Sequence, residues 1–369
     1  MRVYVIIPKK YSKFLEEELA LVKTLYRDKD IVGFEVVRSQ ARKTYLSSRK
    51  IEELKQLEFD KLIVMDRLKP SQLINLMREI KREVVDRVLL ILEIFAIHAG
   101  SREALLQIEL AKLKYTLPLV KEAIRYAKLG ELHGFLGAGR YGYEKYYLML
   151  KKKEARLRRE TENLRLVRNV QRKARQDLGL PHVVIVGYTC AGKTSLFNVI
   201  TKLAMPVGPE PFTTLTPKAY RVNYKDTSFI LVDTVGFIRD IPPEIVEAFY
   251  ATLEEVSESD LIVNVVDASK PLYSVIEEIN TSREILRKLG AQGKPVIYAL
   301  NKIDLVPATA TETLLEEVGK YINDSDVVIP ISCTKRINVD LLLEKICVEL
   351  NKRGSFYEKD IRSEIWTQT

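Results

Sequence analysis

The sequence predicts an α/β protein: a parallel α/β domain, a long antiparallel helical hairpin, and a second α/β domain whose sheet is mostly parallel. Over residues 1–98, short apolar runs alternate with amphipathic stretches, which is typical of parallel strands separated by helices. Over 99–180 the strand signal is absent and two long helical patterns flank a cluster of glycines. Strands and helices alternate again over 181–351, and the polar tail 352–369 is too short for another domain.

Composition places the chain among ordinary globular proteins. With 369 residues, 46% of them hydrophobic, it is long enough for about two or three domains. No apolar run approaches the roughly 20 residues that span a bilayer, and the N-terminal apolar stretch is too short for a secretory signal. The 3 cysteines form no Cys-x-x-Cys pair and predict no disulfide framework. We therefore expect a cytoplasmic monomer without a membrane span.

The first domain is expected to hold a small parallel sheet. Its candidate strands are residues 3–7, 31–37 and 62–65, with 84–85 as a weaker fourth. The amphipathic helices expected between them cover 12–26, 49–58 and 71–81. No glycine-rich phosphate loop occurs in this part of the sequence, so we expect no nucleotide to bind here.

Two helices form the expected hairpin. An apolar stripe runs from Leu105 to Val120 along the first helix. In the second, Leu150, Leu157 and Leu164 fall 7 residues apart, a spacing that suits packing along a seam. The glycines between the helices, at positions 130, 134, 137, 139 and 142, predict a connecting loop.

The second helix carries most of the chain's excess positive charge. The net charge is +9, and residues 151–175 alone hold 11 basic against 3 acidic residues. One interpretation is a solvated outer helix face. The other is contact with nucleic-acid phosphates, in which tyrosines at 141, 143, 146 and 147 stack on unpaired RNA bases rather than packing at the hairpin tip. The RNA-binding candidates are Arg140, Arg156, Arg158, Arg159 and Arg165.

The stretch GYTCAGKT, residues 187–194, matches the pattern G-x-x-x-x-G-K-[ST] of a phosphate-binding loop. An apolar run suited to a buried strand, 182–186, precedes it, and helical apolar spacing, 195–200, follows. A strand, a glycine loop and a helix N-terminus in this order present free N–H groups and a helix dipole to an anion. Lys193 would then reach the terminal phosphates and Thr194 would ligate Mg²⁺. A plain turn has no use for that pair.

Further motifs follow in order, each after its own strand. The apolar run 229–232 ends in Asp233, whose carboxylate can hold Mg²⁺ through water, and the N–H of Gly236 can meet a γ-phosphate oxygen. The sequence Asn-Lys-Ile-Asp at 301–304 offers a carboxylate to the two donors of guanine, a pair that adenine lacks. The loop 332–334 can touch the base from its other side. Together these motifs predict binding of GTP rather than ATP.

A proline-rich segment, 205–217, separates the phosphate loop from Asp233. Its 4 prolines and 1 glycine exclude both a helix and a central strand. Its hydroxyl side chains are Thr213, Thr214 and Thr216. A loop that becomes ordered around Mg²⁺ and γ-phosphate, and relaxes after hydrolysis, is a switch.

With these motifs the chain resembles a translation-factor-class GTPase, and its upstream half is similar to the HflX family. Residues 102–113, REALLQIELAKL, look like a characteristic helix of that family. Residues 187–198, 231–256 and 260–269 are similar to its nucleotide region, and the resemblance extends over essentially residues 1–350. It implies an α/β N-terminal domain, a helical hairpin and a P-loop GTPase domain. It also implies binding to the large ribosomal subunit, with rRNA as the anionic partner, in ribosome dissociation or rescue.

The resemblance also implies residue roles. The catalytic centre would comprise Lys193, Thr214 and Gly236, with Mg²⁺ held by Thr194 and Thr214 directly and by Asp233 through water. The implied set that binds GTP or GDP is Gly187, Tyr188, Thr189, Cys190, Ala191, Gly192, Lys193, Thr194, Ser195, Phe212, Thr213, Thr214, Asp233, Gly236, Asn301, Lys302, Asp304, Ser332, Cys333 and Thr334.

The sequence departs from the family pattern in three places, and at Phe237 it differs from many other switch GTPases. Cys190 replaces the usual asparagine, and because a thiol is a poor ligand for K⁺, potassium is not expected as a cofactor. The loop 137–144 lacks the usual Gly-Pro-Gly-Glu run. The loop 332–334 has Cys333 and Thr334 where Ser-Ala-Lys is common, although its backbone can still contact the base. Phe237 follows Gly236 where many switch GTPases have a glutamine that orients the attacking water. Phe237 either points away from the nucleotide or covers it, and we expect slow intrinsic hydrolysis.

The motifs leave a second class of function open. The protein would then be a nucleotide-gated RNA-binding or remodelling protein whose hydrolysis only times release. An ATPase is disfavoured by the Asn-Lys-Ile-Asp motif at 301–304.

Overall fold

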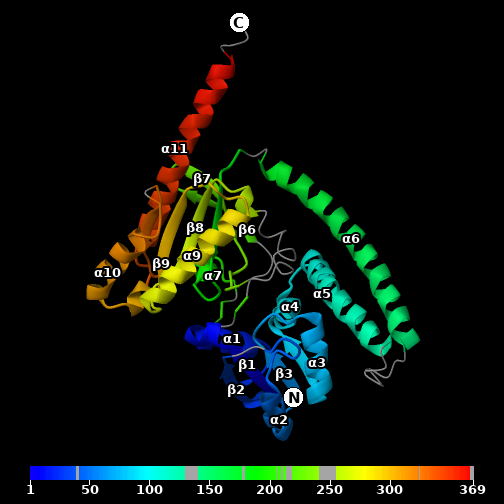
Figure 1. Cartoon of the computed structure of the whole chain (residues 1–369). Helices are drawn as coiled ribbons and strands as arrows, with labels where there is room; N and C mark the ends of the chain where they lie inside the picture. Colours follow the sequence, from blue (N-terminus) through cyan, green and yellow to red (C-terminus); the bar gives the residue numbers. More distant parts are fainter. Residues whose placement is uncertain are drawn as a thin grey trace. The chain divides into compact units, whose positions relative to one another are not determined.

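The computed structural model describes residues 1–38, 41–128, 140–176, 179–205, 207–208, 211–212, 218–240, 255–323 and 325–365, without the side chains of 140–143, 168–176 and 353–365. The chain divides into two compact units, each with its own sheet (Figure 1). Among the described residues, the first unit comprises those up to Val167 and the second those from Arg168 onward. The predicted α/β class is confirmed.

The sheet of the first unit is parallel throughout, with strand order β2-β1-β3-β4. Its strands are β1 Val3–Pro8, β2 Ile31–Val37, β3 Lys61–Val64 and β4 Glu83–Asp86. Val5 and Ile63 are fully buried, as expected for parallel strands covered by helices. The predicted strands are all confirmed, including the weak one at 84–85.

Short helices surround this sheet. They are η1 Lys9–Phe14, α1 Leu15–Leu25, η2 Asp28–Asp30, α2 Ser48–Gln56, α3 Pro70–Ile80 and α4 Arg87–His98. The helix expected over 12–26 is divided, because a 3-10 segment precedes α1. The sequence pattern does not predict α4. This helix buries most of its circumference, so it lacks the polar face that produces an amphipathic pattern.

Side chains of the first unit close the carboxyl edge of its sheet. Asp66, which follows β3, accepts hydrogen bonds from Lys10 Nζ at 2.8 Å and from the Tyr45 hydroxyl at 2.8 Å. Arg87, which follows β4, forms two hydrogen bonds of 3.0 Å with the carboxylate of Glu18. Both members of this ion pair are buried. These groups bind one another at the edge where open α/β sheets usually bind ligands.

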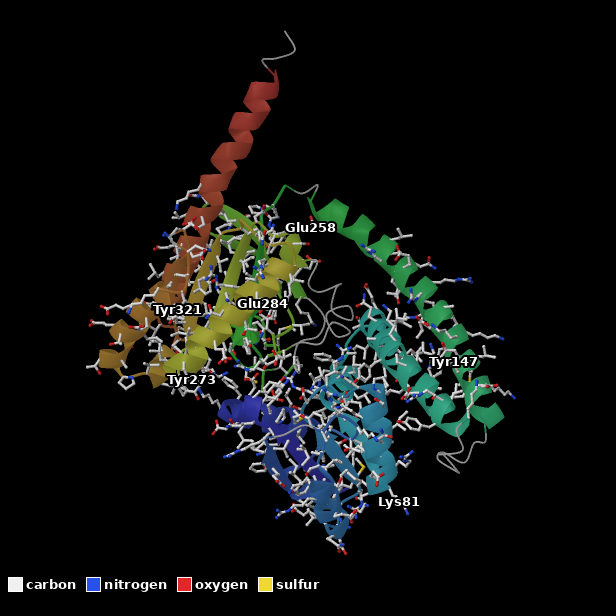
Figure 2. All side chains as sticks on the ribbon, viewed as in Figure 1. Lys81, Tyr147, Glu258, Tyr273, Glu284 and Tyr321 are labelled. Carbon is white, nitrogen blue, oxygen red and sulfur yellow. The ribbon has the colours of Figure 1, made fainter. Side chains whose placement is uncertain are left out.

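The predicted antiparallel hairpin consists of α5 (Arg102–Lys128) and α6 (Arg140–Gln176). Apolar side chains join the two helices along a seam made of Leu113, Leu117, Val120, Leu150 and Leu157. Tyr147, labelled in Figure 2, packs against the same cluster, which matches the packing interpretation of that tyrosine. Lys128 pairs with Glu144 at 3.4 Å near the facing ends of the two helices. The predicted glycine loop lies outside the described residues, except Gly142, which belongs to α6.

The second unit is built on a mixed sheet with strand order β10-β9-β8-β5-β7-β6, in which only the β6–β7 pair is antiparallel. Its strands are β5 His182–Gly187, β6 Lys218–Tyr224, β7 Thr227–Asp233, β8 Leu261–Asp267, β9 Val296–Asn301 and β10 Val327–Pro330. Strands β5, β8 and β9 are buried along their whole length, which confirms the central strands expected from the apolar runs.

Helices of the second unit pack on this sheet. They are α7 Lys193–Thr201, α9 Leu272–Lys288, η4 Ile303–Leu305, α10 Ala308–Gly319 and α11 Val339–Ile365. Phe197 of α7 and Leu342 of α11 meet Leu231 and Val263 of the sheet in one core. The segment expected as a short tail, 352–369, continues α11 as far as Ile365.

Candidate functional site

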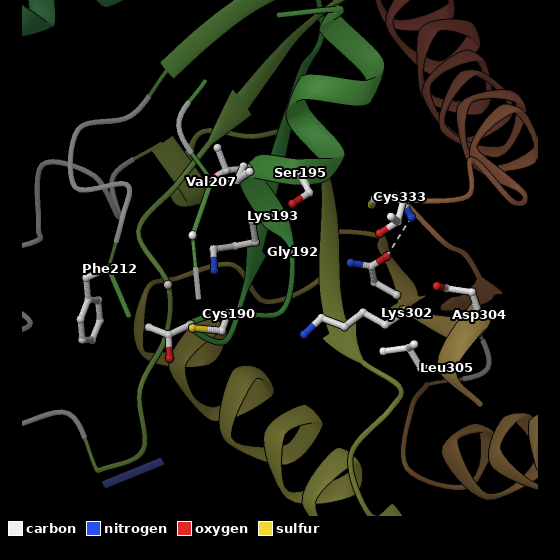
Figure 3. A pocket seen from close by; sticks show the side chains of 16 residues that line it. Cys190, Gly192, Lys193, Ser195, Val207, Phe212, Lys302, Asp304, Leu305 and Cys333 are labelled. Carbon is white, nitrogen blue, oxygen red and sulfur yellow. Dashed lines mark hydrogen bonds between the residues drawn. The ribbon is translucent and has the colours of Figure 1, made fainter. Parts of the chain in front are cut away.

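The predicted motifs of the second unit meet around one cavity of about 580 Å³ at the carboxyl edge of the sheet (Figure 3). It is lined by Thr189, Cys190, Gly192, Lys193, Thr194, Ser195, Val207, Gly208, Phe212, Gly236, Asn301, Lys302, Asp304, Leu305, Cys333 and Thr334. Other predicted site residues are buried but do not line it: Tyr188, Ala191, Asp233 and Ser332. Gly187 ends β5. Thr213 and Thr214 lie outside the described residues.

The phosphate loop connects β5 to α7, as its sequence predicts. Gly192 precedes α7 with a φ of 97°, a conformation that glycine adopts without strain. A Cβ at this position would lie 2.2 Å from Nδ2 of Asn301, so the loop also requires glycine for close packing. The first N–H groups of α7 therefore open onto the cavity, where the helix dipole favours an anion.

Lys193 supplies a buried amine to this end of the cavity. Its side chain is only 6% exposed, and Nζ donates a hydrogen bond to the carbonyl oxygen of Tyr188 at 2.6 Å. Burial lowers the pKa of Lys193 to about 8, although nearby Asp233 opposes the shift. An anion in the cavity would favour the charged form of this amine and so raise its pKa.

Thr194 and Asp233, two of the three residues predicted to hold Mg²⁺, contact each other. The hydroxyl of Thr194 donates to Oδ2 of Asp233 at 2.9 Å, and both residues are buried. Mg²⁺ is held by few protein oxygens, and it keeps several waters or substrate phosphates. A hydroxyl beside one carboxylate, next to a phosphate loop, fits that ion. Elsewhere in the described residues, no group of three or more His, Cys, Asp or Glu could hold a metal.

Gly236 and Phe237 attach the segment after β7 to the phosphate loop. A Cβ on Gly236 would lie 2.8 Å from Cγ2 of Thr189 and 3.0 Å from Nζ of Lys193, so only glycine leaves room for the amine. Phe237 forms a parallel bridge with Tyr188, and its ring is buried without lining the cavity. Phe237 therefore stays outside the lining of the cavity, and its role toward a nucleotide remains a prediction.

Asn301 organises the part of the cavity formed by the Asn-Lys-Ile-Asp motif. Its amide donates to the carbonyl oxygen of Ala191 at 2.8 Å, and its oxygen accepts from the N–H of Cys333 at 3.1 Å. Asn301 therefore ties the phosphate loop to the loop after β10, and it also lines the cavity, where its predicted contact with the base stays a prediction. Asp304, the motif's carboxylate, is exposed to the cavity. Lys302 lies along the wall, and its Nζ pairs with Asp267 at 2.6 Å.

Two cysteines border the cavity with different surroundings. Burial raises the pKa of Cys333 to about 12, so its thiol stays neutral and its backbone N–H provides the contact. Ser332 accepts a hydrogen bond from the N–H of Lys335 at 3.0 Å, which shapes the same loop. Cys190 is exposed and has a φ of 62° at the tip of the phosphate loop.

Sequence reasoning did not assign Val207, Gly208 or Leu305 to the site. Leu305 is 66% exposed and follows the Asn-Lys-Ile-Asp motif directly, so its position next to Asp304 was the available signal. Val207 and Gly208 belong to the proline-rich segment, but neither has a polar side chain that would indicate a contact with a nucleotide. Phe212, which was predicted, is buried with a positive φ of 66°.

Four candidate RNA-binding residues of α6 are exposed but mostly compensated by acidic neighbours: Arg156, Arg158, Arg159 and Arg165. Arg158 pairs with Glu154 at 2.8 Å, and Arg156 lies 3.6 Å from Glu160. Arg159 is exposed, and Arg165 lies 4.0 Å from Glu162. The side chain of Arg140 lies outside the described residues. Exposed surface pairs of this kind are weak and leave the cations accessible to a stronger anion.

In the part of the chain that the structure describes, none of the helices is long and apolar enough to cross a membrane. The family model described as "50S ribosome-binding GTPase" matches residues 182–302. Models described as "GTP-binding GTPase Middle Region" and "GTP-binding GTPase N-terminal" match 98–175 and 13–96.

Relatives resemble the chain over most of its length. GTPase HflX of Hyperthermus butylicus is 43% identical over 358 residues, which are 94% of this chain and 95% of the relative. GTPase HflX of Saccharolobus solfataricus is 42% identical over 344 residues, 91% of this chain and 95% of the relative. A crystal structure of a GTP-binding protein from the archaeon Sulfolobus solfataricus, in complex with GDP, is 36% identical, covers 95% of this chain and 99% of that chain, and has a TM-score of 0.50. The chain therefore belongs to the HflX family and is a GTP-binding GTPase.

Proposed function

We propose that this GTPase is a switch that binds the large ribosomal subunit through rRNA and acts in ribosome dissociation or rescue. The observation that carries the proposal is the shared cavity, in which Lys193, Gly236 and the proline-rich segment meet at one end and Asp304 at the other. A nucleotide's terminal phosphate would thus contact the segments that can report its presence. The printed description of the family matched at 182–302, a 50S ribosome-binding GTPase, supports the partner.

The proposed site follows the geometry. Lys193 and the N–H of Gly236 would hold the γ-phosphate, and Thr214 would complete the catalytic centre. Thr194 and Thr214 would bind Mg²⁺ directly and Asp233 through water; the ion would supply positive charge beside the phosphates. Because Phe237 can neither donate nor accept a hydrogen bond, intrinsic hydrolysis is expected at about 10⁻⁴ to 10⁻² s⁻¹, as in unassisted switches.

Asp304 and its neighbours Asn301 and Lys302 form the proposed guanine site. Asp304→Asn is expected to weaken GTP binding at least ~10-fold, because a polar contact to a base edge contributes roughly 1–3 kcal/mol. Xanthosine triphosphate, with a carbonyl where guanine has an amine, should bind better to the variant. Competition titrations of both nucleotides measure this, and unchanged GTP affinity would place the base elsewhere.

The proposed organisation has three domains, 1–98, 99–180 and 181–351, and the separate family matches over 13–96, 98–175 and 182–302 support these boundaries. We further propose that the protein is a cytoplasmic monomer that binds GTP and GDP and does not use K⁺ as a cofactor. The GDP complex of the Sulfolobus solfataricus relative supports the product state.

Co-sedimentation with purified large subunits tests the partner. Binding is expected with a non-hydrolysable GTP analogue and to be much weaker with GDP. Replacing Arg156, Arg158, Arg159 and Arg165 by glutamine should weaken this binding, leave GTP affinity unchanged and reduce the salt dependence, because fewer counterions are released.

A matched control removes the same charge from the second unit, with glutamine at the exposed residues Lys288, Lys320, Lys335 and Lys352. This control should retain ribosome binding. If the α6 variant binds as well as the control, the basic residues of α6 form a solvated face. If naked RNA competes fully with subunits whatever the nucleotide, the RNA-remodelling alternative is favoured.

A further inference from the structure

Lys302 is held from behind the cavity by a buried carboxylate. Its Nζ donates to Oδ2 of Asp267 at 2.6 Å, while the other oxygen of Asp267 accepts from both the N–H and the hydroxyl of Ser269, at 3.1 and 2.6 Å. Asp267 is 4% exposed and does not line the cavity. Its carboxylate is therefore fixed by three donors, only one of which belongs to the cavity wall.

The sheet sets the position of this pair. Asp267 ends β8 directly beside Asn301, which ends β9, and the N–H of Ala268 donates to the carbonyl oxygen of Asn301 at 2.8 Å. Lys302 follows with a positive φ of 64°, which turns its side chain back toward β8. Two adjacent strand ends thus place the carboxylate within reach of the lysine.

The pairing has a consequence for the cavity. With Nζ anchored, the aliphatic stem of Lys302 extends across the wall from the side of Asp304 toward Cys190 (Figure 3). A lysine stem is flexible, and ordering it upon binding costs conformational entropy. Anchoring it beforehand removes that cost from nucleotide binding and presents an apolar surface to the flat face of a base.

We propose that Asp267 is a positioning residue of the base site: it holds Lys302 so that the stem forms a preorganised wall against the guanine ring. This inference rests on the proposed base site around Asp304. It adds a residue that lies within the family-like stretch 260–269 but was given no role there, and that acts through Lys302 rather than by touching the nucleotide.

A double-mutant cycle tests the proposal, with GDP as the ligand so that hydrolysis does not enter. Asp267→Asn keeps the shape of the side chain and is expected to lower GDP affinity about fivefold, and Lys302→Ala about tenfold, the range expected for coupled contacts. If Asp267 acts through Lys302, the double variant should stay within about twofold of Lys302→Ala. Independent losses that multiply would overturn the proposal, as would unchanged affinity in Asp267→Asn.

Glu154→Gln serves as the matched control. Glu154 lies in α6 and pairs with Lys151 at 2.9 Å, with side-chain exposures of 8% and 49%, against 6% and 32% for Asp267 and Lys302. This variant should leave GDP affinity within about twofold, since neither residue lines the cavity. Thermal unfolding of each variant separates a loss of folding from a loss of binding.

Asp304→Asn, measured in parallel, distinguishes a failure of the proposed base site from a failure of the proposed role of Asp267. If Asp304→Asn leaves GDP affinity unchanged, the base site itself is misplaced. If Asp304→Asn weakens GDP binding and Asp267→Asn does not, the base site stands and the role of Asp267 is wrong.

Discussion

The two sheets of this protein share a parallel design but differ at their carboxyl edges. In the first unit, Asp66 and Arg87 follow their strands and turn to partners of the same unit, Lys10, Tyr45 and Glu18. In the second, a glycine loop and short polar motifs follow the strands and leave a cavity of about 580 Å³. Strand order alone therefore does not make a nucleotide site. What decides is whether the residues after the strands satisfy one another or remain available to a ligand.

The largest expected effect concerns the closed edge, that is, the carboxyl edge of the first unit's sheet, where side chains of that unit bind one another. Arg87→Met would leave the carboxylate of Glu18 buried without its guanidinium, which typically costs about 3–5 kcal/mol of unfolding free energy. Urea denaturation of the full chain, followed by circular dichroism, measures this loss, and GTP affinity should be unchanged in the folded protein. The double variant Glu18→Leu with Arg87→Met should recover most of the stability. A loss of nucleotide affinity at full stability would contradict the separation of the two edges.

The open edge is the carboxyl edge of the second unit's sheet, which holds the cavity. A substitution at Gly192 should disrupt nucleotide binding there. In Gly192→Ala the new Cβ would overlap the amide of Asn301 at a positive φ, and each strain costs on the order of 1–3 kcal/mol, so we expect GTP affinity to fall about 100-fold. Gly290→Ala is the matched control, because its φ is 74° but no atom lies within 4 Å of the added Cβ. Only the first variant should lose binding; equal affinities would show that the loop tolerates a side chain.

Lys193 should make nucleotide binding at the open edge depend on pH. Its amine titrates near a pKa of about 8, and bound phosphates should raise that pKa, so binding takes up a proton at higher pH. GDP affinity should therefore fall as pH rises, by about tenfold between pH 7 and pH 9. Calorimetric titrations across this range measure the effect. In Lys193→Arg the charge persists, and a slope as steep as that of the wild type would assign the titration to another group.

The smallest effect is expected for Phe237. Phe237→Ala removes a buried ring that does not line the cavity, so single-turnover GTP hydrolysis should change less than tenfold, because an apolar group offers no charge stabilisation. Measurements with and without large subunits separate intrinsic from assisted hydrolysis. A collapse of the rate at unchanged GTP affinity would show that the ring contributes directly, and the open edge would then include it.

The sequence predicts the open edge far better than the closed one. Glycine spacing and the residues after each strand are local signals, so Lys193, Gly236 and Asp304 could be assigned from short motifs. The Glu18–Arg87 pair joins residues 69 positions apart and belongs to no motif. Helix α4 lacks periodicity because it is buried on most sides. The role of Asn301 depended on contacts with Ala191 and Cys333 that only the folded chain reveals.

The bridge at Phe237 has a consequence for how long a nucleotide stays bound. The N–H of Phe237 donates to the carbonyl oxygen of Gly187, and the N–H of Thr189 donates to that of Phe237, both at 2.9 Å. A macromolecule that pulls this segment outward would strip two hydrogen bonds from the phosphate loop without touching the nucleotide. By thermodynamic reciprocity, bound phosphates resist such a pull. If this short ladder senses the γ-phosphate as proposed, a partner that displaces it would also accelerate GDP release.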